Sequence, residues 1–184
     1  MPKISVIIPH YPLNEELNTK LDECVKSLKG YNELILVVNQ GIGFGKAVNW
    51  GLRMAKGDYL IVVSNDDTVE GNLEDLCDFQ SVTTPIVNNI KQEFWGTMFC
   101  LPRWVYDKIG GFDEQFELAF FEDDDYIMRL RQAKIPMKPC ETVKVRTLGS
   151  QTVKAMDINP YNDNRQKFIK KWGVDSSNPV RYDF

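Results

Sequence analysis

Residues 59–67 read YLIVVSNDD, and this stretch decides the fold class. Its first five residues are apolar or aromatic and rich in β-branched side chains, the pattern of a strand buried on both faces. The strand runs directly into Asn65, Asp66 and Asp67. In α/β proteins with parallel sheets, ligands bind beyond the carboxyl ends of the strands. The stretch therefore predicts a strand that carries polar side chains to a binding site.

Two similar strands precede this stretch, at residues 4–8 (ISVII) and 34–38 (LILVV), and we expect both to be buried. Helical spacing of apolar residues predicts one helix from Asn14 to Gly30 and another over 47–55, before Gly57. Alternating strands and helices predict a parallel sheet with right-handed crossovers. The fold class is therefore α/β, Rossmann-like, with a mostly parallel central sheet flanked by helices.

The second half of the chain is less regular, and we expect its last helix to pack Phe168 and Trp172 on the core. The elements expected here are a short helix at 73–79, strands at 81–87 and 94–101, helices at 102–109 and from Glu122, short strands at 137–146, and a helix at 160–173. Without repeats or a low-complexity linker, residues 1–184 are expected to form one domain.

Composition excludes several classes of function. The net charge of −4 and the pI near 5.1 argue against a nucleic-acid surface, which needs Lys and Arg. No apolar run approaches the roughly 20 residues of a transmembrane helix, and the first residues lack signal-peptide anatomy, so we expect a cytoplasmic protein. The four cysteines are widely spaced, which is unlike zinc or dithiol motifs. His10 is the only histidine.

Two acidic runs are candidate sites. Asn65, Asp66 and Asp67 could hold a hard divalent cation, although Asn and Asp are also favoured in polar turns. Residues 122–125 (EDDD) could supply a general base, because adjacent carboxylates raise one another's pKa, although acidic residues also favour a helix start. The glycine-rich stretch 41–46 fits neither the dinucleotide nor the Walker pattern, so we interpret it as a close-packed turn.

Five segments, in this order, resemble the family-2 glycosyltransferases, in particular their rhamnosyltransferase-like branch. They are ISVIIPHY at 4–11, GFGKAVNWGL at 43–52, GDY through NDDT at 57–68, GGFDEQF at 110–116, and FEDDD through Arg129 at 121–129. The resemblance implies a GT-A fold and an inverting transfer from a nucleotide-diphosphate sugar to a hydroxyl-bearing glycan or lipid-linked acceptor. It also implies a nucleotide-sugar-binding half at 1–70, an acceptor and catalytic half at 71–155, and a C-terminal helical extension at 156–184.

Site roles follow from the same resemblance. Asp67, the last acid of the DxD-like motif, would bind Mn²⁺ or Mg²⁺ on the donor diphosphate, and Asp123, with Glu122 as its rival, would be the catalytic base. The remaining donor-side residues would be Pro9, His10, Tyr11, Asn39, Lys46, Asn65 and Asp66. On the acceptor side the resemblance places Gly111, Phe112 and Asp113, and we add Trp95.

The chain departs from the family pattern in three ways. A strand–helix unit is missing after residue 38, and Asn39 stands near the place of the Asp that reads the base. The usual metal-binding His is absent near Arg146, so we hypothesise that Arg146 neutralises diphosphate charge and weakens the dependence on metal. Little chain follows the catalytic region for an elaborate acceptor site.

Two alternatives remain open. A sugar nucleotidyltransferase shares this general architecture, but it usually begins with a glycine-rich basic loop, and residues 8–12 (IPHYP) lack one. A degenerate, non-catalytic nucleotide- or carbohydrate-binding module is favoured by the missing His and is opposed by the retained acids at 65–67 and 122–123.

Overall fold

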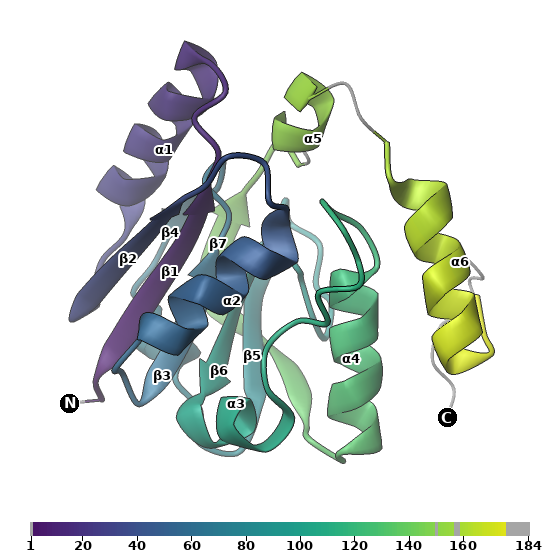
Figure 1. Cartoon of the computed structure of the whole chain (residues 1–184). Coiled ribbons are helices and arrows are strands. Elements are labelled where there is room, and N and C mark those ends of the chain that lie inside the picture. Colours follow the sequence, from purple (N-terminus) through teal and green to yellow (C-terminus); the bar gives the residue numbers. More distant parts are fainter. Residues whose placement is uncertain (1, 150, 157–158, 176–184) are drawn as a thin grey trace.

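The computed structural model describes residues 2–149, 151–156 and 159–175, and seven strands form one sheet in the order β2-β1-β3-β6-β5-β7-β4 (Figure 1). The strands are β1 (Ile4–His10), β2 (Glu33–Val38), β3 (Tyr59–Val63), β4 (Thr68–Glu70), β5 (Val82–Val87), β6 (Met98–Pro102) and β7 (Met137–Arg146). The helices are α1 (Glu15–Ser27), α2 (Phe44–Met54), the 3₁₀ turn η1 (Leu73–Leu76), α3 (Arg103–Ile109), α4 (Glu122–Gln132), α5 (Gln151–Met156) and α6 (Tyr161–Trp172).

The first half of the sheet forms as its apolar strands predict. β1 pairs in parallel with β2 on one side and with β3 on the other, and α1 and α2 make the crossovers. Alternate side chains of β1 enter two different cores: Ile7 packs with α2, α3 and α4, whereas Val6 and Ile8 pack with α1 and η1. The predicted α/β class, with helices on both faces of the sheet, is confirmed.

One expectation about burial is wrong. β2 lies at the edge of the sheet, where Leu36 is 43% exposed and Val38 is 57% exposed. Only Ile35 and Val37, on the opposite face, reach the core below α2. A run of five apolar residues therefore marked an edge strand with one covered face, because no further strand packs beyond it.

The second half of the sheet is mixed. β6 pairs antiparallel with β3 and β5, β7 pairs parallel with β5, and β4 pairs antiparallel with β7. The strand expected at 94–101 begins only at Met98, and the short strands expected at 137–146 are the single strand β7. The sequence did not predict β4 or α5, because each is short and only Val69 of β4 is buried.

Helix α6 packs against this second half beside α4 (Figure 1). It begins after Pro160 and ends at Gly173, as predicted. Phe168 is fully buried against Phe116, Phe121 and Met128, which confirms the packing expected for its apolar edge. Residues 176–184 of the expected C-terminal extension lie outside the described residues. None of the described helices has the length and apolar character needed to span a bilayer.

Candidate active site

A cavity of about 350 Å³ opens beyond the carboxyl ends of β1 and β3. This is the position at which α/β sheets bind ligands. Six stretches line it: Pro9 and Tyr11 after β1, parts of 39–44 before α2, 64–66 after β3, parts of 87–97, parts of 118–123 at the start of α4, and parts of 147–156 after β7. Loops from both halves of the chain therefore build one site.

Three residues that line this cavity each have a buried side-chain polar atom without a hydrogen-bond partner among the described residues. The atoms are Oδ2 of Asp66, Nε1 of Trp95 and Oε2 of Glu122. Buried polar atoms in folded proteins nearly always have a partner, because an unpaired one keeps its full desolvation cost. Three such residues around one cavity indicate a site shaped for a polar ligand.

The two acids after β3 differ in their exposure to the cavity, although both contact Thr147. Asp66 lines the cavity, whereas Asp67 is fully buried and its carboxylate accepts hydrogen bonds from the Thr97 hydroxyl at 2.8 and 3.0 Å. Burial raises the pKa of Asp66, and burial together with the charge of Asp66 raises the pKa of Asp67 well above its usual range. The structure thus brings Asp66 to the cavity, and not Asp67, to which we assigned the metal.

His10 does not line the cavity but positions a residue that does. Its ring is buried between Asn18 and Asn65: Nε2 lies 3.0 Å from Asn18 Oδ1, and Asn65 Nδ2 lies 2.8 Å from Nδ1. Both contacts are satisfied when the neutral ring carries its hydrogen on Nε2, so that Nδ1 accepts from Asn65. The Asn65 amide is thereby fixed with its oxygen free of this contact.

Asn39 is occupied by its own loop. Its Nδ2 donates to the His10 carbonyl at 3.0 Å, and its Oδ1 accepts from the backbone amides of Gly41 and Ile42 at 2.9 and 3.3 Å. The side chain lines the cavity, but its hydrogen bonds go to the backbone and hold the loop at residues 39–42 in place. The predicted donor residue Lys46, in the first turn of α2, is not part of the described cavity lining.

The acidic residues at the start of α4 also differ in location. Glu122 and Asp123 line the cavity, whereas Asp125 is fully buried on the far side of the helix. Burial, and then the charge of Asp123, raises the pKa of Glu122 well above its usual range. Asp123 packs against Gly96, where an added Cβ would lie 2.7 Å from Asp123 Oδ2. A glycine at position 96 therefore makes room for the Asp123 carboxylate.

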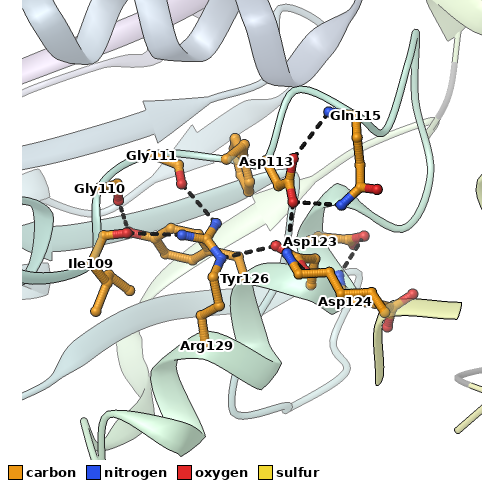
Figure 2. A network of polar contacts seen from close by, with 12 residues as sticks. Ile109, Gly110, Gly111, Asp113, Gln115, Asp123, Asp124, Tyr126 and Arg129 are labelled. Carbon is orange, nitrogen blue, oxygen red and sulfur yellow. Dashed lines mark hydrogen bonds and ion pairs between the residues drawn. The ribbon is translucent and has the colours of Figure 1, made fainter. Parts of the chain in front are cut away.

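The segment 110–113 serves the scaffold and not the cavity (Figure 2). The Gly111 carbonyl accepts from Arg129 Nη2 at 2.7 Å, and the backbone of Phe112 exchanges two hydrogen bonds with the Asn49 side chain. Asp113 forms an ion pair with Lys171 at 2.6 Å. These contacts tie the loop to α2, α4 and α6, so the structure does not bring Gly111, Phe112 or Asp113 to the acceptor side of the cavity, whereas Trp95 does line it.

Arg146 faces a second, separate hollow. Along β7, Val143 and Val145 are buried, and the alternation leaves Lys144 and Arg146 exposed on the other face. Arg146 lines the hollow beside β4 and not the main cavity. The hypothesis that Arg146 neutralises a diphosphate is therefore not supported by its position.

The ionisable residues that line the main cavity are mostly acidic. Among the described lining residues, three are carboxylates (Asp66, Glu122 and Asp123) and none is Lys or Arg. Within the described ranges no group of three or more His, Cys, Asp or Glu residues is arranged to hold a metal ion by itself. A cation next to the lining is Lys154, whose Nζ donates to the Gly149 carbonyl at 3.1 Å and whose charge opposes the rise in the pKa of Asp66.

The model for glycosyl transferase family 2 matches residues 21–134, more than half of the 184 residues. The chain belongs to this family. The match includes the acids after β3 and those at the start of α4, so the cavity described above lies between the two parts of the family domain that supply its carboxylates. No match was found among curated protein sequences.

Solved glycosyltransferase structures share the fold at low sequence identity. GalNAc-T7 with UDP, GalNAc and Mn²⁺ superposes with a TM-score of 0.70 at 13% identity, over 94% of this chain and 48% of that one. The catalytic domain of Drosophila β1,4-galactosyltransferase 7 with xylobiose gives 0.60 at 17%, over 76% and 65%. Mannosyltransferase PcManGT from Pyrobaculum calidifontis with GDP-Man and Mn²⁺ gives 0.58 at 13%, over 92% and 68%. The GT-A-like fold is thereby confirmed, and the chain spans about half of the GalNAc-T7 chain.

Sequence reasoning missed much of the cavity wall. Thr97, Thr147 and Gly149 line it, as do Gln151, Thr152, Val153 and Met156 at α5. Their side chains are common polar or apolar types in irregular segments, and no spacing distinguishes them. A signal appears only in the backbone: Asn88, Leu118 and Phe120 line the cavity with φ of 49°, 62° and 72°. Such strained conformations gather at functional sites.

Proposed function

We propose that this chain is an inverting glycosyltransferase that moves a hexosyl or deoxyhexosyl group from a nucleotide-diphosphate sugar to a hydroxyl acceptor in this cavity. The proposal rests on one observation: three residues that line the same cavity, Asp66, Trp95 and Glu122, each have an unpartnered buried polar atom. Membership of the family supports the reaction class. Two solved structures of the same fold, GalNAc-T7 and PcManGT, contain a nucleotide or a nucleotide sugar together with Mn²⁺.

The donor diphosphate would reach this cavity with Mn²⁺ or Mg²⁺. A diphosphate beside Asp66 and Asp123, with no Lys or Arg among the described lining residues, would be repelled, and a divalent cation would offset this repulsion. Such a cation commonly binds through one or two carboxylates, phosphate oxygens and water, which fits a site in which Asp66 lines the cavity and has an unpartnered carboxylate oxygen. When bound, the cation would neutralise the charge of the departing diphosphate. Metal dependence should therefore be strict.

Asp123 is the proposed general base. It lines the cavity, whereas burial and the charge of Asp123 favour the protonated form of its neighbour Glu122. The Asp123 carboxylate would accept the proton of the acceptor hydroxyl as that oxygen attacks the anomeric carbon from the face opposite the diphosphate. Protonated Glu122 would then donate a hydrogen bond to a bound hydroxyl, and Trp95 Nε1 would donate another.

The nucleoside would lie at the β1 end of the cavity. Tyr11 packs beside Gly41, where an added Cβ would be 3.5 Å from the ring, and the Met156 side chain is as close, at 3.6 Å. This leaves an aromatic and apolar slot next to the Asn65 amide. Phe120 and Ile90 add apolar side chains to the lining, and these would contact the acceptor.

The test is a thermal-shift screen of UDP, GDP, dTDP and CMP, each with Mn²⁺ and with EDTA, followed by turnover of the matching nucleotide sugars. One nucleotide should stabilise the protein with Mn²⁺ only, by about 2.7 kcal/mol at a hundredfold excess over its Kd. Mn²⁺ alone is the control. Stabilisation without turnover of any sugar would favour the degenerate binding module, and no stabilisation by any nucleotide would overturn the proposed donor site.

A further inference from the structure

The wall of the cavity that precedes Asp123 is built from a strained segment. Leu118, Phe120 and Phe121 have φ of 62°, 72° and 70°, in the left-handed region that residues with a side chain rarely adopt. The chain passes from this segment directly into Glu122 and Asp123, the first residues of α4. Its backbone therefore determines where the carboxylate of Asp123 lies, and it persists only if neighbouring structure holds it.

Helix α6 holds this segment through one side chain. Asn164 is 1% exposed, and its Nδ2 donates to the carbonyls of Glu117 at 2.8 Å, Ala119 at 2.8 Å and Phe120 at 3.2 Å. Two amide hydrogens are thus shared among three carbonyl groups of the strained turn. One turn further along α6, Lys167 Nζ donates to the Gln115 carbonyl at 2.8 Å.

The same segment also contacts the donor side of the cavity. The Leu118 carbonyl accepts from the backbone amide of Phe44 at 2.7 Å, and an added Cβ at Gly43 would lie 2.7 Å from the Leu118 nitrogen. Leu118, Ala119 and Phe120 line the cavity on its inner side. Residues 117–120 are therefore fixed from outside by α6 and from inside by the loop before α2.

We propose that Asn164 is a positioning residue for transfer: its amide holds the 117–121 turn and thereby holds Asp123 against the acceptor. This inference rests on the proposed function of the cavity. Asn164 does not line the cavity, so it acts only through the backbone that it holds. Only an N–H donor can satisfy three carbonyls, which explains why an amide, and not a carboxylate, occupies this position.

The test compares Asn164→Asp with Asn162→Asp, which adds the same charge at an exposed position of α6. The Asn164→Asp side chain has the same shape but presents a carboxylate to three carbonyl oxygens. Hydrogen exchange should speed up at least about tenfold in peptides covering 115–124 and stay unchanged in β1 and β3. Asn164→Ala removes the donors without adding charge and should give a smaller change of the same kind.

Turnover with the nucleotide sugar selected by the thermal-shift screen supplies the second readout. In Asn164→Asp, kcat should fall about 100-fold while the KM for the donor stays within about twofold, because a misplaced base affects chemistry and not donor binding. Lowering the pH protonates the new carboxyl and restores one donor, so the kcat ratio of variant to wild type should rise. Asn162→Asp should match wild type in both assays.

The outcomes separate the two proposals. If wild type turns over no donor, the proposed function fails, and hydrogen exchange still reports whether Asn164 holds the segment. Unchanged exchange at 115–124 in both Asn164 variants overturns the holding role. Faster exchange with unchanged kcat overturns the positioning role, and a global loss of protection in both variants shows that Asn164 only stabilises the fold.

Discussion

The acidic run after β3 and the acidic run that begins α4 both contribute carboxylates to the cavity. The two runs differ in the partners of the carboxylates that are buried instead. After β3, Asp66 lines the cavity, and the adjacent buried Asp67 has hydroxyl partners in Thr97 and Thr147. On α4, two residues along a helix turn by about 200°. Asp123 therefore faces the cavity, whereas Asp125 contacts Lys171 Nζ at 2.6 Å and Trp172 Nε1 at 2.9 Å on α6, together with Arg129 Nε at 2.9 Å on its own helix.

The comparison shows that neighbouring acids in one run can have different roles. The direction of the backbone decides which carboxylate reaches the cavity and which is buried in the scaffold. The buried carboxylate of α4 has two cations and an indole N–H as partners, which compensate for its loss of contact with water. The buried carboxylate after β3 has neutral hydroxyl partners, and its pKa is raised well above its usual range by burial and by Asp66. In each run the cavity-facing residue is the candidate for chemistry, and substitutions in matched pairs test that division.

The largest effect is expected from Asp123→Asn. The amide cannot accept the acceptor's proton, so kcat should fall about 10³-fold with little change in the KM of the donor. Asp124→Asn, one residue along the same helix turn and outside the described cavity lining, is the matched control and should stay within about twofold. Steady-state kinetics measure both, and equal losses in the two variants would contradict the assignment of the base.

Arg129→Met should cost about 3 kcal/mol of unfolding free energy, because it removes a cation from a fully buried carboxylate. The change also leaves the Ile109 and Gly111 carbonyls without their guanidinium donor (Figure 2). Urea unfolding measures the loss. Nucleotide binding to the folded variant should persist, since Arg129 does not line the cavity, and a loss of binding with normal stability would refute this role.

Asp66→Asn should abolish the Mn²⁺-dependent stabilisation by nucleotide, about 2.7 kcal/mol at a hundredfold excess over Kd. Asp67→Asn, the neighbouring substitution of identical chemistry, should retain that stabilisation, because its side chain lies inside against Thr97. Thermal shifts with and without Mn²⁺ distinguish the two. If Asp67→Asn loses the stabilisation and Asp66→Asn keeps it, Asp67 is the metal ligand.

The stability of the protein should depend on pH through Asp67. A carboxyl whose pKa is raised on folding binds its proton more tightly in the folded state, so the folded state loses stability as pH rises from the ordinary value of 3.8 through the raised pKa. Asp67→Asn removes this titration and should flatten that part of the curve. Unfolding free energies from pH 4 to 8, on both proteins, measure the slope, and Asp66→Asn serves as the comparison.

The smallest effect is expected from Arg146→Ala, within about 0.5 kcal/mol in stability and in the nucleotide-induced shift. The guanidinium is exposed beside β4 and lines a different hollow. Activity should still be lost in EDTA. Weakened nucleotide binding in this variant, or full activity without metal, would restore the hypothesis that Arg146 replaces the cation.

The sequence by itself determined the class of fold, the parallel order of the first three strands and the two acidic runs. Buried β-branched strands and helical spacing are local patterns, and residues such as Pro160 and Gly173 mark helix ends through their own backbone preferences. Motif order in addition indicated the family, which the match over residues 21–134 shows.

Only the tertiary structure decided which member of each run reaches the cavity. The direction of Asp66 and Asp67 depends on Thr97, and the direction of Asp123 depends on Gly96 and on a turn that Asn164 holds from another helix. Likewise, the glycines and acid at 110–113 proved to be scaffold because Asn49, Arg129 and Lys171 occupy their polar groups. Thr97, Asn49 and Lys171 each lie 30 or more residues from their partners in the chain, so short-range sequence patterns do not reveal these contacts.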